Sequence, residues 1–377
     1  MRVVVAPDSF GGTLSAAQAA SAIAAGWRDA APAEEVVERP LSDGGPGFVE
    51  VLRSGLEGVA VPVATTDPLG RPVTGQVFVS GDTAYVESAH ACGLHLLAAG
   101  ERDPLLTSSY GLGILLAAAV ESGAGTIVVG LGGSATNDGG AGLLAALGAV
   151  PVDASGAALP PGGAALRSVS AIAGAPRLRQ VSLVAASDVD NPLLGPAGAS
   201  AVFGPQKGAT EDDVLLLDDA LSAWAGALQA LPGCPDGVAD LPGAGAAGGL
   251  GAALLALGAR FESGIALVRR AVGFDAALDG AAVVITGEGS LDAQSLRGKV
   301  VTGVAAAAAE RGLPCVAIAG QVSLGRQQLA AAGIEAAHSL VDHVGSVEAA
   351  MSHPAAGLRS LSTSVAKQWS RGHPRVG

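Results

Sequence analysis

The sequence predicts an α/β protein with two domains: a doubly wound parallel sheet formed by both chain ends, and an inserted second α/β domain with a mixed sheet. Short β-branched runs alternate with Ala-rich helical stretches, which is the pattern of such folds. The length of 377 residues suits about two domains. Because 49% of the residues are apolar and only 15% are charged, the chain can also fill a substantial buried core.

The order of elements follows from these alternating patterns. Residues 59–88 differ, because short alternating runs with turns at Pro68-Leu69-Gly70 and Gly81-Asp82 are typical of a β-meander. Residues 150–164 are expected to form a Pro/Gly-rich loop, and the mildly basic stretch 359–375 a solvated tail. The expected strands are 2–6, 35–39, 126–130, 181–186, 282–286, 314–319 and 334–341, and the expected helices are 15–30, 107–122, 138–148, 211–230, 246–258, 264–273, 297–311 and 325–332.

The strands divide between two domains. Residues 1–64 and 281–377 hold the strands of the first sheet, and residues 65–280 form the inserted domain. The five strands of the first sheet are 2–6, 35–39, 282–286, 314–319 and 334–341. Because ligands of such sheets bind at the carboxyl ends of strands, we expect the active site there, between the two domains.

The composition excludes several classes of protein. A net charge of −13 argues against a nucleic-acid partner, since phosphate neutralisation needs clustered Lys and Arg. Cys92, Cys234 and Cys315 are too widely spaced for a disulfide framework or a zinc site, and a reducing cytoplasm is expected. The longest apolar stretch, 246–259, is interrupted by Gly and too short to span a bilayer, and no signal peptide precedes the first strand, so no membrane association is expected.

A Gly-rich turn, Ala6 to Thr13, follows the first strand. It contains Asp8 and Ser9, and it leads into a helix whose start carries the capping-box pair of Ser15 and Gln18. Free N–H groups at a helix start favour an anion, and the carboxyl end of a strand is the usual catalytic edge. The alternative is an ordinary turn in which Asp8 binds the backbone.

Two Asp-Gly-Gly turns follow strands, one with Asp43 and Gly44 and one at 137–140 that begins with Asn137. The second ends the run GLGGSATNDGG at 130–140. Glycine lets the backbone approach a phosphate, and an adjacent Asp can hold Mg²⁺. The alternative is a pair of tight turns in which Asp acts as a cap.

Two further motifs carry paired carboxylates. Asp188 and Asp190 flank one residue after strand 181–186, with Lys207 not far along the chain. Such a pair can bind Mg²⁺ or supply a base, although an Asx turn before a proline is the plainer reading. The other motif, GEGSLD at 287–292, precedes Lys299, whose charge opposes the dipole of the helix that starts there. An anion beside Lys299 would remove that conflict, and a surface lysine is the alternative.

Some signals are weak. The string GAGAAG at 243–248 matches a dinucleotide motif, but it follows a loop, so helix packing and a close-approach loop are expected instead. No Walker-type P-loop string occurs. His90 and His95 have poor metal-ligand spacing.

Taken together, the motifs resemble the bacterial glycerate kinases of the type-1 family. The resemblance rests on APDSF from 6, SDGGPG at 42–47, DPLGRPV at 67–73, TSSYGLG at 107–113, GLGGSATNDGGAG at 130–142, DVDNPLLGPAGASAVFGPQKGA at 188–209, LPGAGAAGGLGAALLA at 241–256 and ITGEGSLDAQSLRGK at 285–299. It implies a flavodoxin-like domain with a second α/β domain inserted, the cofactors ATP and Mg²⁺, and D-glycerate as the substrate, with 2-phosphoglycerate as the usual product.

Two positions depart from the family pattern. Gly11 stands where a Lys is common, and Ser290 where an Arg is frequent. Both changes remove a cation from an expected phosphate or carboxylate site. Lys207, Arg297 and Lys299 are candidates to compensate.

Roles are assigned on this basis. Phosphoryl transfer needs positioning and charge neutralisation. Asp188 is the favoured base, with Asp8 and Asp292 as rivals. Lys299 is also expected to be catalytic, by neutralising phosphate oxygens. Mg²⁺ is assigned to Asp190 and Glu288. The residues expected to bind the nucleotide are Gly132, Gly133, Ser134, Gly287 and Gly289. Those expected to bind the substrate are Arg71, Ser9, Asp43, Gly44, Asn137 and Lys207.

Two other functions remain open at this stage. A strand followed by Asp188-Val189-Asp190 has the shape of an aspartyl-phosphate phosphatase loop. A non-catalytic ligand-binding protein descended from a kinase would explain the two missing cations. The oligomeric state also stays open, with a homodimer as one arrangement.

Overall fold

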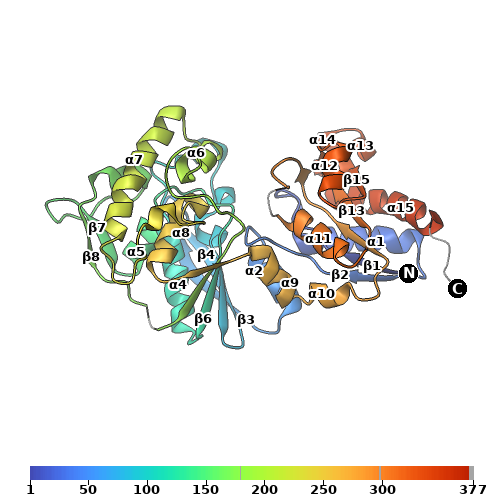
Figure 1. Ribbon diagram of the computed structural model, residues 1–377, viewed down its shortest axis with the longest axis horizontal. Coiled ribbons are helices and arrows are strands. Elements are labelled where there is room, and N and C mark those ends of the chain that lie inside the picture. Colours follow the sequence, from blue (N-terminus) through green and yellow to red (C-terminus); the bar gives the residue numbers. More distant parts are fainter. Residues whose placement is uncertain (179, 297–298, 373–377) are drawn as a thin grey trace. The chain divides into compact units, whose positions relative to one another are not determined.

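The computed structural model describes residues 1–178, 180–296 and 299–372. Within it the chain forms two compact units (Figure 1). Unit 1 comprises Met1–Asp43, Glu50–Leu56 and Ile265–Gly377, and unit 2 comprises Gly44–Val49 and Glu57–Gly264. The sequence placed the boundaries at 64/65 and 280/281. Residue 64 lies inside a strand of unit 2, and residues 265–280 belong to unit 1. Arg297 and the start of the helix expected from 297 lie outside the described residues.

Unit 1 contains a five-stranded parallel sheet in the order β15-β13-β11-β1-β2. Counted along the chain this is the order 2-1-3-4-5, the flavodoxin-like arrangement, with its switch point between β1 and β11. The doubly wound parallel sheet predicted from both chain ends is therefore confirmed. The strands are β1 (Arg2–Val5), β2 (Glu35–Glu38), β11 (Val283–Thr286), β13 (Cys315–Ala319) and β15 (Ala336–Ser339), and a separate small ladder pairs β12 (Ser290–Leu291) with β14 (Gln321–Val322).

The helices of unit 1 bury the faces of this sheet. One face forms a core of Val3, Val5, Val283 and Ile285 with residues of α1 and α15, while α11 packs on β11 and β13. The helices are α1 (Ala16–Ala30), α2 (Phe48–Gly55), α9 (Gly264–Ala271), α10 (Phe274–Ala277), α11 (Val300–Ala309), α12 (Arg326–Ala331), α13 (Leu340–Val344), α14 (Val347–Ser352) and α15 (Pro354–Gly372); α2 and α9 begin in unit 2.

The helix α15 corrects the expectation of a solvated tail from residue 359. Leu358, Leu361, Val365 and Ala366 are buried in the core with α1. The Ser362 hydroxyl donates to the Ile23 carbonyl at 2.7 Å. Arg359 and Lys367 are exposed on this amphipathic helix, and charge alone could not reveal the apolar residues between them.

Glycine at position 26 makes this helix pair possible. A Cβ at Gly26 would clash with the backbone carbonyl of Arg359 and lie 2.9 Å from the Ser362 Cβ. Gly26→Ala should therefore lower the free energy of unfolding by about 1–3 kcal/mol, the usual cost of overpacking. The control is Gly226→Ala in α7 of unit 2, where a Cβ meets nothing within 4 Å. That change should stabilise by about 0.5–1 kcal/mol. Equal effects in denaturant titrations would contradict the proposed packing.

Unit 2 contains a six-stranded mixed sheet in the order β10-β9-β6-β5-β4-β3. β3, β4 and β5 are antiparallel, which confirms the predicted meander, and the other pairs are parallel. The strands are β3 (Val59–Thr66), β4 (Pro72–Ser80), β5 (Thr83–Glu87), β6 (Thr126–Gly130), β9 (Ser182–Ala186) and β10 (Arg260–Glu262). The helices are α3 (Ala89–Cys92), α4 (Tyr110–Glu121), α5 (Ala141–Ala146), α6 (Ala199–Phe203), α7 (Glu211–Leu228) and α8 (Ala246–Ala256).

Segment 150–164, predicted to be a loop, is partly ordered into a hairpin. β7 (Ala149–Val152) pairs antiparallel with β8 (Ala171–Gly174). The sequence predicted a loop here because the apolar run of β7 is short and is followed closely by glycine and proline. Within the described residues, no helix is long and apolar enough to cross a membrane.

Candidate functional site

Two loops meet at the switch point of the unit 1 sheet. Asp8 follows β1, and Glu288 follows the neighbouring strand β11. The Asp8 amide donates to the Gly287 carbonyl at 2.8 Å, and the Ser9 amide donates to an Asp8 carboxylate oxygen at 2.6 Å. These bonds hold two carboxylates at the carboxyl edge of the sheet, which is where ligands of this fold bind.

The carboxylates of this edge interact unfavourably with one another. Burial raises the pKa of Asp8 well above its ordinary value, and the nearby Asp43 and Glu288 carboxylates raise it further. Burial also raises the pKa of Glu288, while Lys299 lowers the pKa of both groups. Glu288 Oε1 is buried and has no hydrogen-bond partner among the described residues. Among the described residues, the site therefore holds more negative charge than Lys299 balances, and a cation would stabilise it.

A cavity of about 490 Å³ opens beside these groups in unit 1. A Cβ at Gly289 would lie 3.0 Å from the Gly11 amide, so glycine lets the two loops approach each other. The polar lining comprises Ser9, Thr13, Glu288, Ser290, Asp292, Lys299 and Gln321, and the apolar lining includes Leu340, Val341, Val347, Ala350 and Met351. Gly11 and Ser290, the two positions that depart from the family pattern, both line this cavity.

Glycine-rich turns also converge at the carboxyl edge of the unit 2 sheet. A Cβ at Gly44 would lie 2.6 Å from the Ala186 carbonyl oxygen, one at Gly132 would lie 2.5 Å from Gly45 Cα, and one at Gly133 would lie 2.7 Å from the Pro46 ring. The close packing of the 42–47 and 130–134 turns thus accounts for glycine at these positions. A nucleotide role for Gly132, Gly133 and Ser134 stays a prediction.

The residue Glu87, which the sequence analysis did not single out, fixes the first of these turns. Its side chain is only 3% exposed at the end of β5, and it accepts hydrogen bonds from the Gly47 amide at 3.1 Å and the Val49 amide at 3.2 Å. A carboxylate at the start of α2 also suits the helix dipole. The available signal was a charged residue that ends an otherwise apolar strand.

Lys207 is buried inside unit 2 and is only 1% exposed. Its Nζ donates to the Ser134 Oγ at 3.0 Å and to the Thr136 carbonyl at 2.7 Å. Burial lowers the pKa of Lys207 to about 7. The lysine therefore supports the loop that follows β6, and its predicted contact with the substrate would need that loop to open.

Asn137 and Asp138 belong to the same buried loop. The Asn137 Nδ2 donates to the Ser200 Oγ at 2.9 Å, while its Oδ1 has no hydrogen-bond partner. Asp138 accepts from the Ser109 amide and hydroxyl and from the Gly140 and Gly142 amides, and burial raises its pKa. The glycine run at 243–248 packs behind this loop, because a Cβ at Gly248 would clash with the Thr136 carbonyl. The expected packing role of this run is confirmed.

The carboxylates of Asp188 and Asp190 follow β9, as predicted. Asp188 is partly buried and Asp190 is exposed. Their proposed partners Asp8, Glu288, Asp292 and Lys299 all belong to unit 1. Each set lies at the carboxyl edge of its own sheet, and the assignment of base and metal between the two sets stays a prediction.

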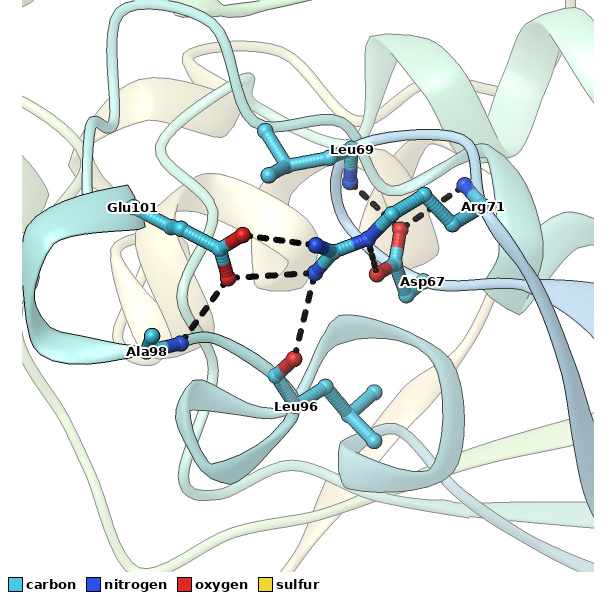
Figure 2. A network of polar contacts seen from close by, with 6 residues as sticks. All are labelled: Asp67, Leu69, Arg71, Leu96, Ala98 and Glu101. Atoms are coloured by element: carbon cyan, nitrogen blue, oxygen red, sulfur yellow. Dashed lines mark hydrogen bonds and ion pairs between the residues drawn. The ribbon is translucent and has the colours of Figure 1, made fainter.

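Arg71 lies in a local network of polar contacts (Figure 2). Its Nε donates to Asp67 at 2.6 Å, its Nη1 to Glu101 at 2.7 Å, and its Nη2 to Glu101 and to the Leu96 carbonyl, both at 3.3 Å. Asp67 is buried. The bonds of Arg71 to Glu101 and Leu96 tie the β3–β4 turn to the segment 96–101. A glycerate carboxylate would have to displace Glu101, and the substrate role of Arg71 stays a prediction.

No three His, Cys, Asp or Glu side chains among the described residues are grouped closely enough to hold a metal ion. His90 contacts the Glu87 carboxylate at 3.7 Å, and the thiols of Cys92, Cys234 and Cys315 are free. A metal at either sheet edge would therefore need ligands from a bound substrate or water as well.

Comparison with known proteins gives a consistent result. The model of the glycerate kinase family matches residues 3–370. A glycerate 2-kinase of Escherichia coli is 44% identical over 356 residues, covering 93% of each chain, and a glycerate kinase of Bacillus subtilis is 42% identical over 372 residues, covering 97% of each.

The fold agrees with a solved structure as well. A crystal structure from Salmonella typhimurium LT2, which carries the provisional designation glycerate kinase 2, is 41% identical and superposes with a TM-score of 0.78 over 99% of both chains. Because the family match and these relatives span nearly the whole sequence, the chain belongs to the glycerate kinase family.

Proposed function

We propose that the protein transfers the γ-phosphoryl group of ATP to D-glycerate, on the 2-hydroxyl, to give 2-phosphoglycerate and ADP. The observation that carries this proposal is the Asp8, Glu288 and Lys299 edge at the switch point of unit 1, in a chain of this family. The 2-hydroxyl is supported by the printed name of the Escherichia coli relative, glycerate 2-kinase.

The residues at this edge fit Mg²⁺. Among the described residues, Glu288 has a buried carboxylate oxygen without a hydrogen-bond partner, and the carboxylates of this edge outnumber its lysine. Magnesium binds through one or two carboxylates together with substrate phosphates. Glu288 would hold the ion directly or through water, and a metal role for Asp190 stays a separate prediction. When bound, the ion would neutralise charge on the phosphates.

We propose Asp8 as the first candidate for the base, with Asp188 and Asp292 as rivals. A base must accept the hydroxyl proton as the new O–P bond forms, and this is favoured by a pKa closer to the working pH. The pKa of Asp8 is raised by burial and by Asp43. Lys299, which lines the same cavity, would neutralise phosphate oxygens, and the glycine loops at Gly287 and Gly289 would let them approach.

The other predicted contacts complete the proposal. Ser9, Asp43, Gly44, Asn137, Lys207 and Arg71 are assigned to glycerate, and Gly132, Gly133 and Ser134 to the nucleotide. Three free thiols, two of them buried, suit the reducing cytoplasm that we propose as the location.

The test is coupled detection of ADP with purified protein, ATP, Mg²⁺ and D-glycerate. Release of ADP should require glycerate, stop with EDTA, and yield 2-phosphoglycerate by NMR of the product. ADP release that is the same without glycerate would contradict the proposal. Release of inorganic phosphate from phosphoglycerate would favour the phosphatase alternative, and ligand binding without turnover would favour the non-catalytic one.

A further inference from the structure

We propose that the unit 1 cavity binds the nucleotide, with its adenine base against an apolar wall formed by Leu340, Val341, Val347, Ala350 and Met351. The inference rests on the proposed ATP-dependent function and adds the place of the nucleoside. The wall is supplied by α13 and α14 and lies in the same cavity as Glu288, Gly289 and Lys299.

The wall presents two large apolar side chains to the cavity. Val347 is 51% exposed and Met351 is 60% exposed, although both are large apolar side chains, while Leu340 and Ala350 behind them are buried. Exposed apolar side chains grouped beside convergent polar groups are typical of a ligand pocket. Their exposure costs free energy that a bound apolar surface would recover.

The cavity has a polar side and an apolar side, which together fit a ligand with one charged end and one apolar end. Lys299 and the glycine at position 289 suit a phosphate, and the carboxylates Glu288 and Asp292 require a cation with it. Glycerate has three carbons and offers almost no apolar surface to the opposite wall. A nucleoside triphosphate with Mg²⁺ has a charged end and a flat, largely apolar end, and a cavity of about 490 Å³ lies within the range of small-molecule sites.

A second cavity, of about 700 Å³ in unit 2, is the alternative binding site for the adenine base of the nucleotide. Tyr110, Leu106 and Leu159 line it, but no Lys, Arg or His of the described residues does. Its two carboxylates are already engaged, Asp67 by Arg71 and Asp138 by Ser109 and backbone amides. This cavity therefore has an apolar surface without the cation that a polyphosphate needs.

The experiment compares neutral substitutions, so that phosphate binding is not disturbed by new charge. The test variant is Val347→Ser/Met351→Ser, and the matched controls are Leu106→Ser in the rival cavity and Leu215→Ser on α7, at side chains that are 59% and 68% exposed. Isothermal titration with Mg²⁺ present measures the affinity of each for ATP and for inorganic tripolyphosphate.

The double variant should bind ATP about 10- to 100-fold more weakly, the scale of two apolar side chains that lose contact with the base. Its tripolyphosphate affinity and the ATP affinity of both controls should stay within twofold of wild type. ATP affinity of the double variant within twofold of wild type, or a loss confined to Leu106→Ser, would overturn the inference.

These outcomes separate the inference from the proposed function. Wild-type protein that phosphorylates glycerate, combined with normal ATP binding by the double variant, would overturn only the nucleoside site. Wild-type protein that binds ATP through this wall but never phosphorylates glycerate would overturn only the proposed function.

Discussion

Asp8→Asn should lower kcat for glycerate phosphorylation by about 10²–10⁴-fold, the usual contribution of a general base. The substitution keeps the shape of the side chain but removes the proton acceptor. In wild type, the acid limb of kcat/KM should lie above the usual range of an Asp carboxyl, because burial and Asp43 raise the pKa of Asp8. That limb should disappear in the variant.

Stability provides the control for this experiment. A carboxyl whose pKa is raised by folding destabilises the folded state at pH values where it is ionised. Asp8→Asn should therefore leave the melting temperature at pH 7 unchanged or higher, so that lost activity cannot be explained by unfolding. Asp188→Asn and Asp292→Asn should be assayed in parallel. Near wild-type kcat in Asp8→Asn, with a large loss in one of the other two, would move the base to that residue.

Lys207→Met should remove a strong pH dependence of stability. Burial lowers the pKa of Lys207 from 10.5 to about 7 in the folded protein. Between these two values the unfolded chain binds the proton and the folded chain does not, so the free energy of unfolding rises with pH. The slope from this one group is about 1.4 kcal/mol per pH unit.

Denaturant titrations at pH 7, 8 and 9 measure this slope. The difference between wild type and Lys207→Met should increase with pH in favour of wild type, whereas the exposed Lys367→Met should follow wild type at each pH. At pH 7 the variant also loses the hydrogen bonds to Ser134 and Thr136. If the free energy of unfolding changed with pH equally in wild type and Lys207→Met, Lys207 would not be neutral in the folded state.

The local pattern of the sequence determined the elements of the fold and most of their type. The five strands of the unit 1 sheet and the meander at 59–88 were predictable because β-branched runs, alternation and glycine turns act over a few residues. The motifs after β1 and β11 could be placed at a catalytic edge for the same reason, since a residue that follows a parallel strand lies at its carboxyl end.

Only the tertiary structure decided what those side chains contact. Asp8 and Glu288 are 280 positions apart in sequence, yet the β1–β11 register brings their loops together, so that Glu288 helps to raise the pKa of Asp8. Lys207 is a buried support of the 130–137 loop, and Arg71 is held by Asp67 and Glu101. Burial depends on chain segments far apart in sequence, and the pKa and hydrogen bonding of a charged side chain depend on burial. A sequence pattern that spans a few residues therefore indicates which chemistry is available, while the packing of distant segments decides which side chains are free to perform it.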